Sequence, residues 1–268
     1  GLFDKKYCDV CGEKIGLLGN RKLEDGNLCK ECARKLSPWF SDRRSSTVEE
    51  IKQQLAYREE NRKKAAQFRT TRALGEDRKV LLDEEHRWFT VTRARDLEEA
   101  NPDILDYDAI TGCRMDIDES KTELMRENAD GEEVSYVPPR YEYSYDFFLI
   151  ISVRHPYFDE MRFQLNSSSV YYEPQHAPIS RSPMGHPKRL SAGRVDPEDC
   201  AEYRKYRQMG EEICQRLNEA CRQKQPISTV PEGDTVTNEA EQVTSAAERW
   251  TCPACGGANK GKFCEYCG

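Results

Sequence analysis

Cysteines in CxxC pairs stand near both ends of the 268-residue chain and constrain its fold more than any other feature. CDVC contains Cys8 and Cys11, and CKEC contains Cys29 and Cys32, with seventeen residues between the two pairs. Two cysteines separated by two residues can wrap one metal ion in a tight turn, and this spacing of pairs is typical of four-cysteine zinc sites. Gly12 after the first pair permits the positive φ that such a turn needs. We therefore predict a zinc site here.

A second set of pairs closes the sequence. CPAC contains Cys252 and Cys255, CEYC contains Cys264 and Cys267, and eight residues separate them. About seventeen residues cannot build an apolar core, so a metal ion would have to hold this module together. We expect a second zinc ion here, giving two structural zinc ions per chain.

Other uses of the cysteine pairs are disulfides, redox centres and iron. The first residues, GLFDKKYC, lack the apolar stretch of a secretory signal, so we expect a cytoplasmic protein in which disulfides are rare. A thioredoxin-like pair would need a βαβ setting. Four sulfurs can also hold rubredoxin-type iron, so the choice between zinc and iron stays open. In either case four protein ligands leave no position for water, and both sites are predicted to be structural.

Charge is unevenly distributed along the chain. Residues 1–79 carry 19 basic and 13 acidic groups, whereas residues 80–172 carry 9 basic and 21 acidic groups. The basic block keeps nucleic-acid binding open, and the acidic block argues against it and against a lipid-phosphate site on the middle of the chain.

The order of patterns predicts five segments: a finger over 1–46, a connector helix over 47–75, a β domain with a closing helix over 76–224, a disordered linker over 225–249 and a terminal module over 250–268. Thr47 and Glu50 fit a capping box at the start of the connector, which we expect to be solvated from Arg58 onward. The linker has almost no large apolar groups and cannot offset the entropy of ordering.

The middle of the chain alternates as antiparallel strands do. KVLL and RWFTVT flank a short turn, LMRE and EVSYV flank the loop at 128–131, and every odd position of Tyr141–Val153 is aromatic or aliphatic. A long loop over 173–195 precedes a helix that opens at Asp196 and Pro197. Its apolar stripe should pack on the sheet: Cys200, Tyr203, Tyr206, Met209, Ile213, Leu217 and Ala220. The fold class is therefore α+β, with an antiparallel sheet or barrel closed by a long helix.

Nothing in the sequence assembles a catalytic group, so we expect no enzyme activity and name no catalytic residue. The histidines lie in predicted turns and loops: His86, His155, His176 and His186. The acidic residues Asp103, Asp106, Asp108, Asp116, Asp118 and Glu119 lack EF-hand spacing, and most of them are predicted to lie on the wet faces of strands. The cysteines Cys113, Cys200, Cys214 and Cys221 are expected to be buried as small hydrophobic residues.

Three segments resemble known families. CDVCGEKIG, GNRKLEDGNLCKEC and SPWF resemble a bacterial family of zinc fingers, catalogued as domain of unknown function 4428, and the cysteine pattern looks like a treble-clef finger. Residues 76–222 are similar in layout to a pleckstrin-homology-like or GRAM-like domain, which implies protein or lipid binding. The terminal module resembles the zinc ribbons found at the ends of many bacterial proteins.

These features together predict a zinc-binding, non-catalytic adaptor with a protein partner. The alternatives are a nucleic-acid-binding zinc-finger protein and a peripheral membrane protein that binds lipid through its pleckstrin-homology-like domain; both partners are less favoured. The residues specify neither the partner nor the oligomeric state.

Overall fold

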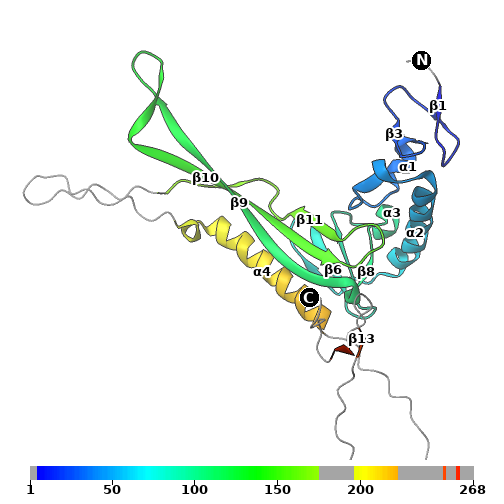
Figure 1. Cartoon of the computed structure of the whole chain (residues 1–268). Helices are drawn as coiled ribbons and strands as arrows, with labels where there is room; N and C mark the ends of the chain where they lie inside the picture. Colours follow the sequence, from blue (N-terminus) through cyan, green and yellow to red (C-terminus); the bar gives the residue numbers. More distant parts are fainter. Residues whose placement is uncertain (1–4, 175–195, 223–249, 252–257, 260–268) are drawn as a thin grey trace, which may run out of the picture. The chain divides into compact units, whose positions relative to one another are not determined.

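A computed structural model describes residues 5–174, 196–222, 250–251 and 258–259 of the chain. The chain divides into two compact units, Gly1–Lys224 and Gln225–Gly268. The first unit is a mixture of helices and antiparallel sheets (Figure 1). No helix in the described ranges is both long and apolar enough to span a membrane.

The chain begins with a small cysteine-rich module, residues 5–46, which we call the finger. It contains two short hairpins, β1 (Lys6–Tyr7) with β2 (Lys14–Ile15) and β3 (Arg21–Lys22) with β4 (Asn27–Leu28). These are followed by α1 (Lys30–Arg34) and a 3-10 turn at Asp42–Ser45. Ile15, Leu23 and Leu28 are buried together with three of the cysteines and Ile51 of the next helix.

Helix α2 (Val48–Gln67) starts at the predicted capping box. The Thr47 side chain accepts a hydrogen bond from the Glu50 amide, and the Glu50 carboxylate accepts one from the Thr47 amide. The prediction that this helix is solvated from Arg58 onward is wrong at two polar positions, because Arg58 and Asn61 are 6% and 5% exposed. Both side chains have buried polar partners that are distant in sequence and lie on a loop of the β domain.

The first sheet has the strand order β5-β6-β7-β8, with bounds Arg72–Leu74, Lys79–Asp83, Trp88–Thr92 and Leu105–Asp106. The predicted hairpin corresponds to β6 and β7, in which Leu82 pairs with Phe89. Strand β5 lies inside the segment predicted as connector helix. A short helix, α3 (Leu97–Ala100), stands between β7 and β8.

The second sheet is built around one long strand. Strand β10 (Glu133–Val153) pairs with β9 (Ile110–Glu127) along one edge and with β11 (Glu160–Gln164) and β12 (Val170–Tyr172) along the other. The odd positions of β10 from Tyr143 to Val153 are buried, which confirms the predicted alternation. The far end of the β9–β10 hairpin extends away from the rest of the sheet (Figure 1).

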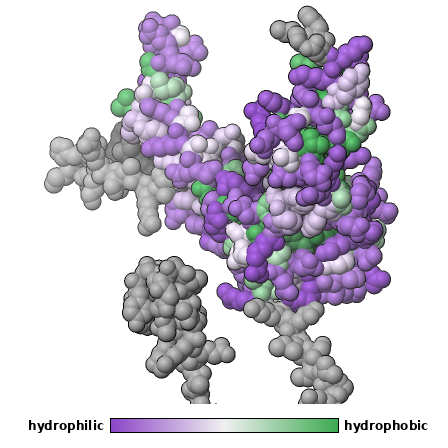
Figure 2. All heavy atoms as spheres, turned by 45° about the vertical axis from the view of Figure 1, so that its right-hand side comes forward, coloured by the Kyte–Doolittle hydropathy of each residue, from purple (hydrophilic) through white to green (hydrophobic). Residues whose placement is uncertain are grey.

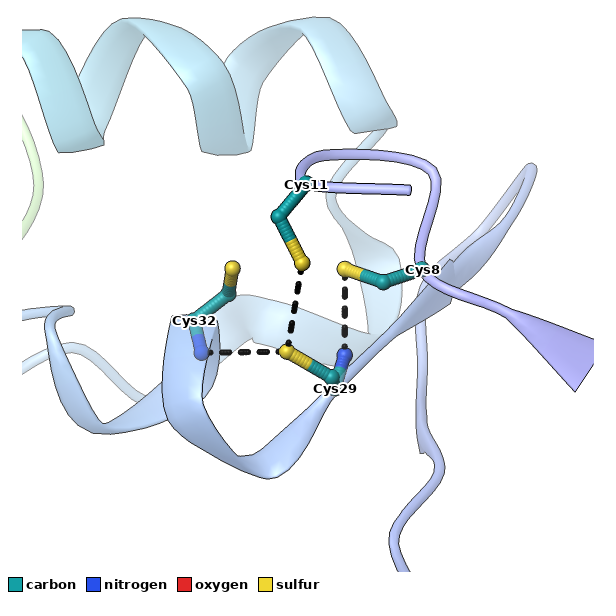
Figure 3. A group of neighbouring side chains, drawn as sticks. All are labelled: Cys8, Cys11, Cys29 and Cys32. Atoms are coloured by element: carbon teal, nitrogen blue, oxygen red, sulfur yellow. Dashed lines mark hydrogen bonds between the residues drawn. The ribbon is translucent and has the colours of Figure 1, made fainter. Parts of the chain in front are cut away.

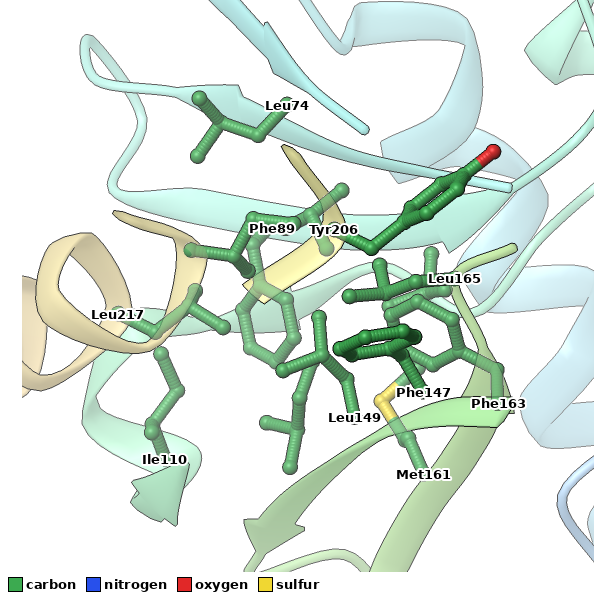
Figure 4. Packing of buried hydrophobic residues seen from close by; sticks show 14 of the residues in the cluster. Leu74, Phe89, Ile110, Phe147, Leu149, Met161, Phe163, Leu165, Tyr206 and Leu217 are labelled. Atoms are coloured by element: carbon green, nitrogen blue, oxygen red, sulfur yellow. The ribbon is translucent and has the colours of Figure 1, made fainter. Parts of the chain in front are cut away.

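The closing helix, α4 (Ala201–Arg222), follows a 3-10 turn at Pro197–Asp199 that Asp196 caps. Tyr206 and Leu217 of α4 contact a core shared with Phe89 of the first sheet and Phe147 of the second (Figure 4). The helix therefore packs on the sheets as predicted.

The predicted barrel is not formed. The described strands of the β domain make two separate four-stranded sheets, and hydrogen bonding breaks where the turn Tyr107–Ala109 leads from β8 into β9. Alternation defines the buried face of each strand, but the register between strands decides whether a sheet closes. Side chains from both sheets still share one core.

In the second unit, strands β13 (Trp250–Thr251) and β14 (Ala258–Asn259) form an antiparallel pair, with Trp250 opposite Asn259. The predicted terminal zinc ligands Cys252, Cys255, Cys264 and Cys267 lie outside the described residues, as do the predicted linker and the loop histidines His176 and His186.

Candidate metal centre

The finger brings the four N-terminal cysteines together. The sulfur atoms of Cys8, Cys11, Cys29 and Cys32 all lie within 4.8 Å of one another, and the Cys11 and Cys29 Sγ atoms are 3.7 Å apart. The first pair comes from the turn between β1 and β2, and the second from the junction of β4 and α1. Figure 3 shows the four side chains converging on one point.

The first pair is held by a tight turn whose backbone hydrogen bonds fix both cysteines. The Gly12 amide donates to the Cys8 carbonyl at 2.8 Å, and the Cys8 amide donates to the Glu13 carbonyl at 2.9 Å. Gly12 has φ +77°, a left-handed conformation that favours glycine. The predicted role of Gly12 is therefore confirmed.

The second pair straddles the start of α1. Cys29 is the N-cap residue, and its sulfur accepts a hydrogen bond from the Cys32 amide at 3.3 Å. The Cys29 amide donates in turn to the Cys8 sulfur, also at 3.3 Å. Two amide donors thus point at sulfur atoms, which stabilises thiolate over thiol.

The pKa values of Cys8 and Cys32 are shifted in opposite directions. Burial opposes ionisation of Cys8, but hydrogen bonds from the backbone of Cys11, Cys29 and Val10 outweigh it and lower the pKa of Cys8 to about 7. Burial and the neighbouring thiols raise the pKa of Cys32. Four thiolates so close together repel one another, and a divalent cation at their centre would remove that repulsion.

The sulfur positions fit a tetrahedral metal ion. A Zn–S bond of about 2.3 Å places tetrahedral sulfurs about 3.8 Å apart, close to the observed Cys11–Cys29 separation. The largest separation allowed by the 4.8 Å limit exceeds this by about 1 Å, a difference that side-chain rotation can close. Four cysteines would complete the coordination shell, so the metal would brace the fold and bind no substrate.

The cluster is part of the finger's apolar core. Cys8, Cys29 and Cys32 are 2%, 9% and 6% exposed, and they pack with Leu28 and with Ile51 of α2. Cys11 is the exposed member. A metal ion here would therefore connect the two hairpins, α1 and the start of α2.

The described histidines contribute to other local structures. His86 Nδ1 lies 2.8 Å from a carboxylate oxygen of Asp83, and its ring stacks on Trp88. His155 stacks on Phe158, and burial together with the charge of Arg58 lowers its pKa to about 4. Within the described ranges, the cysteines of the finger are the only cluster of three or more metal-ligating side chains.

A buried polar network between the finger, α2 and the loop after α3 was missed by sequence reasoning. Arg58 Nη1 is 2.6 Å from Asp103 Oδ1, and the other oxygen of Asp103 accepts a hydrogen bond from Ser37 Oγ at 2.8 Å. Asp103 is an exception to the prediction that most of these acidic residues lie on the wet faces of strands, since it is 2% exposed. The two partners are 45 residues apart, and no local pattern in the sequence links them.

The other four cysteines of the described ranges are half-buried against the core of the β domain, close to the expectation for them: Cys113, Cys200, Cys214 and Cys221. Two of them meet. Cys113 of β9 and Cys214 of α4 have sulfur atoms 2.9 Å apart. The contact with Cys214 and burial raise the pKa of Cys113, while the hydrogen bond from Cys113 lowers the pKa of Cys214.

Residues 6–54 match a family described as Domain of unknown function (DUF4428). The match starts at β1, contains all four cysteines of the finger and ends in the second turn of α2, beyond the predicted boundary at residue 46. No curated protein and no solved structure matches the chain. The family match and the cysteine cluster together fit an N-terminal zinc-finger domain over residues 6–54.

Proposed function

We propose that the chain is a zinc-binding, non-catalytic adaptor protein that acts by binding a protein partner. The observation that carries the proposal is the cluster of four cysteine sulfurs within 4.8 Å, supported by two backbone amides that donate to sulfur. An ion held by four thiolates has no coordination position for water, so the site stabilises a surface and does not activate a nucleophile.

The attachment of the finger to the β domain supports an adaptor role. The Ser37 side chain donates to Asp103, and the Ser37 amide donates to Gln54 Oε1 of α2 at 3.1 Å. Trp39 packs against the core of the β domain. A finger held in this way has a fixed orientation on the β domain, so the two can present one rigid surface and avoid the entropic cost of ordering on binding.

We also propose identities for the β domain and the terminal module. Residues 76–224 are proposed to be a pleckstrin-homology-like domain, and residues 250–268 a zinc ribbon held by Cys252, Cys255, Cys264 and Cys267. The ribbon would search for a partner close to the first unit, at a raised local concentration. The proposed location is the cytoplasm.

Affinity purification from the native cell with three versions of the full chain tests the adaptor role. They are the wild type, the finger variant Cys8→Ser/Cys11→Ser and the control Cys221→Ser, which replaces a half-buried cysteine outside the finger. The proposal expects one set of proteins with the wild type and the control, and its loss with the finger variant. An identical set from all three would refute a role of the finger in binding. If the wild type shifted the electrophoretic mobility of DNA or RNA in a salt-dependent way and the finger variant did not, nucleic-acid binding would be favoured instead.

A further inference from the structure

Two adjacent leucines stand at the tip of the finger without contact to its core. Leu17 and Leu18, in the loop between β2 and β3, are 89% and 88% exposed. Single exposed apolar residues are common on protein surfaces, but two neighbouring leucines exposed to this extent form a small contiguous apolar patch. We call the loop Gly16–Gly19 the tip.

The tip is a defined turn and not a loose end. The Gly19 amide donates to the Gly16 carbonyl at 3.0 Å, which closes the turn around the two leucines. Ile15 immediately before it and Leu23 shortly after it are 7% and 1% exposed and lie in the finger's core. The core is therefore filled by residues that flank the tip, and folding does not need the leucines.

Basic residues occupy the strands next to the tip. Lys14 precedes it on β2, Lys6 lies on β1 opposite Ile15, and Arg21 and Lys22 follow on β3. Arg43 joins this group, since its guanidinium donates to the Lys22 carbonyl at 2.6 Å. None of these five cations forms an ion pair with a carboxylate of the described residues.

Arg43 lies close enough to Arg21 and Arg44 to be repelled by their charges. Partial burial and the charges of Arg44 and Arg21 lower the pKa of Arg43. The Arg21 guanidinium donates to the Leu18 carbonyl at 3.3 Å, so positive charge reaches the leucines themselves. The tip thus combines two exposed leucines with nearby cations that an anionic surface would stabilise.

The tip is also free of the contacts that attach the finger to the β domain. Those contacts come from residues after α1, namely Ser37, which donates to Asp103, and Trp39, which packs on the core of the β domain. Figure 1 shows β1 and β3 at the end of the finger remote from α3. Figure 2 shows a mostly hydrophilic surface with separate apolar areas on the face in view.

We propose that the tip inserts into the surface of an anionic phospholipid bilayer, with Leu17 and Leu18 at the acyl boundary and the surrounding cations on lipid phosphates. A bilayer suits this shape better than a folded protein does. A stable protein interface buries about 800 Å² per partner, far more than two protruding leucines supply, whereas lipids close around a narrow tip. The proposal rests on the metal-bound finger, which holds the tip in shape.

Co-sedimentation of the zinc-loaded full chain with vesicles tests the proposal. Vesicles of phosphatidylcholine alone are compared with vesicles that contain about 30% phosphatidylglycerol. The wild type should bind the anionic vesicles and bind the neutral ones at least about tenfold more weakly. Each lipid-facing cation raises the affinity for an anionic surface roughly fivefold. Leu17→Ser/Leu18→Ser should weaken binding to the anionic vesicles about tenfold or more. Both leucines are exposed, so the variant should keep its fold and its zinc.

The matched control is Met125→Ser/Val137→Ser, which removes two exposed apolar residues from the β9–β10 hairpin and should bind like the wild type. Arg21→Gln/Lys22→Gln should bind the anionic vesicles more weakly, and the binding that remains should depend less on salt concentration. Zinc content, measured in every sample, separates this proposal from the metal-site proposal. A wild type that holds zinc in the finger but does not bind anionic vesicles would overturn the lipid proposal alone. Equal binding by the leucine variant, or a leucine-dependent interaction with polyglutamate but not with vesicles, would also overturn it.

Discussion

The buried ion pair between Arg58 and Asp103 allows a sharp test of how the finger and the β domain are joined. The side chains of Asp103 and Arg58 are 1% and 8% exposed. Arg58 also donates to the carbonyls of Asn101 and Lys35. The change Arg58→Met keeps the apolar stem of the side chain and removes the charge together with three hydrogen bonds.

The expected loss of unfolding free energy follows from the Asp103 carboxylate, which loses its charged partner. Without Arg58, Asp103 keeps only the Ser37 hydroxyl as a side-chain partner, and burial already raises its pKa. Stranding a buried carboxylate in this way costs about 3–5 kcal/mol of unfolding free energy. Replacing both partners, in Arg58→Met/Asp103→Leu, removes the stranded charge and should cost about 0–2 kcal/mol.

The pH dependence of this destabilisation provides an independent test. In the Arg58→Met variant the folded-state pKa of Asp103 rises further above its unfolded value of about 3.9. Its contribution to stability is then present at low pH and lost as pH rises toward the folded-state pKa, by up to about 1.4 kcal/mol per pH unit. The variant should therefore be less destabilised at pH ~5 than at pH ~7.

Urea unfolding of zinc-loaded protein, followed by circular dichroism, measures these differences. The control is Arg62→Met, one turn further along α2, where a 3.4 Å ion pair with Glu59 is largely exposed and its loss should cost less than about 0.5 kcal/mol. A cost below about 1 kcal/mol for Arg58→Met, or the same cost at both pH values, would refute the reasoning.

Three further predictions concern the β domain. Gly75→Ala should cost more than about 1 kcal/mol, because Gly75 has φ +95° and a Cβ would lie 2.7 Å from the Arg78 carbonyl oxygen; thermal melts measure the loss. His155→Phe should flatten the fall in unfolding free energy between pH ~6.5 and ~4, since the unfolded chain binds a proton in that window that the folded chain, with its lowered pKa, does not. The effect should be about 1 kcal/mol, because the ring is partly exposed; an unchanged pH slope in urea titrations would contradict it. With limiting iodoacetamide, Cys214 should be alkylated before Cys113, because its pKa is the lowered one; peptide mapping reads the order, and the reverse order would refute it.

Features encoded within a few residues could be predicted from the sequence. The capping box at Thr47 depends on two side chains three residues apart, and the alternation along β10 reflects the two faces of a single strand. The finger's cysteines belong to the same class. Their spacing predicted that the four sulfur atoms would converge, because a four-cysteine metal site requires this spacing.

Features that depend on distant partners could not be predicted. The burial of Arg58 depends on Asp103, and the separation into two sheets depends on strand register. The buried residues of α2 do recur at helical spacing, but several are polar and look like a solvated face until their partners are known: Ile51, Gln54, Arg58, Asn61 and Ala65. The exposure of Leu17 and Leu18 could not be predicted either, because leucines next to a core strand are usually buried in the core.

Metal analysis of the purified chain tests the central claim, that the four cysteines of the finger hold a structural zinc ion. We expect two zinc ions per wild-type chain and the loss of one of them in Cys8→Ser/Cys11→Ser. We also expect zinc retention to fall as the solution is acidified, because protons compete with zinc for the thiolates. Zinc-free wild-type protein, prepared without chelator in zinc-containing medium, or a finger variant that holds as much zinc as the wild type, would contradict the claim.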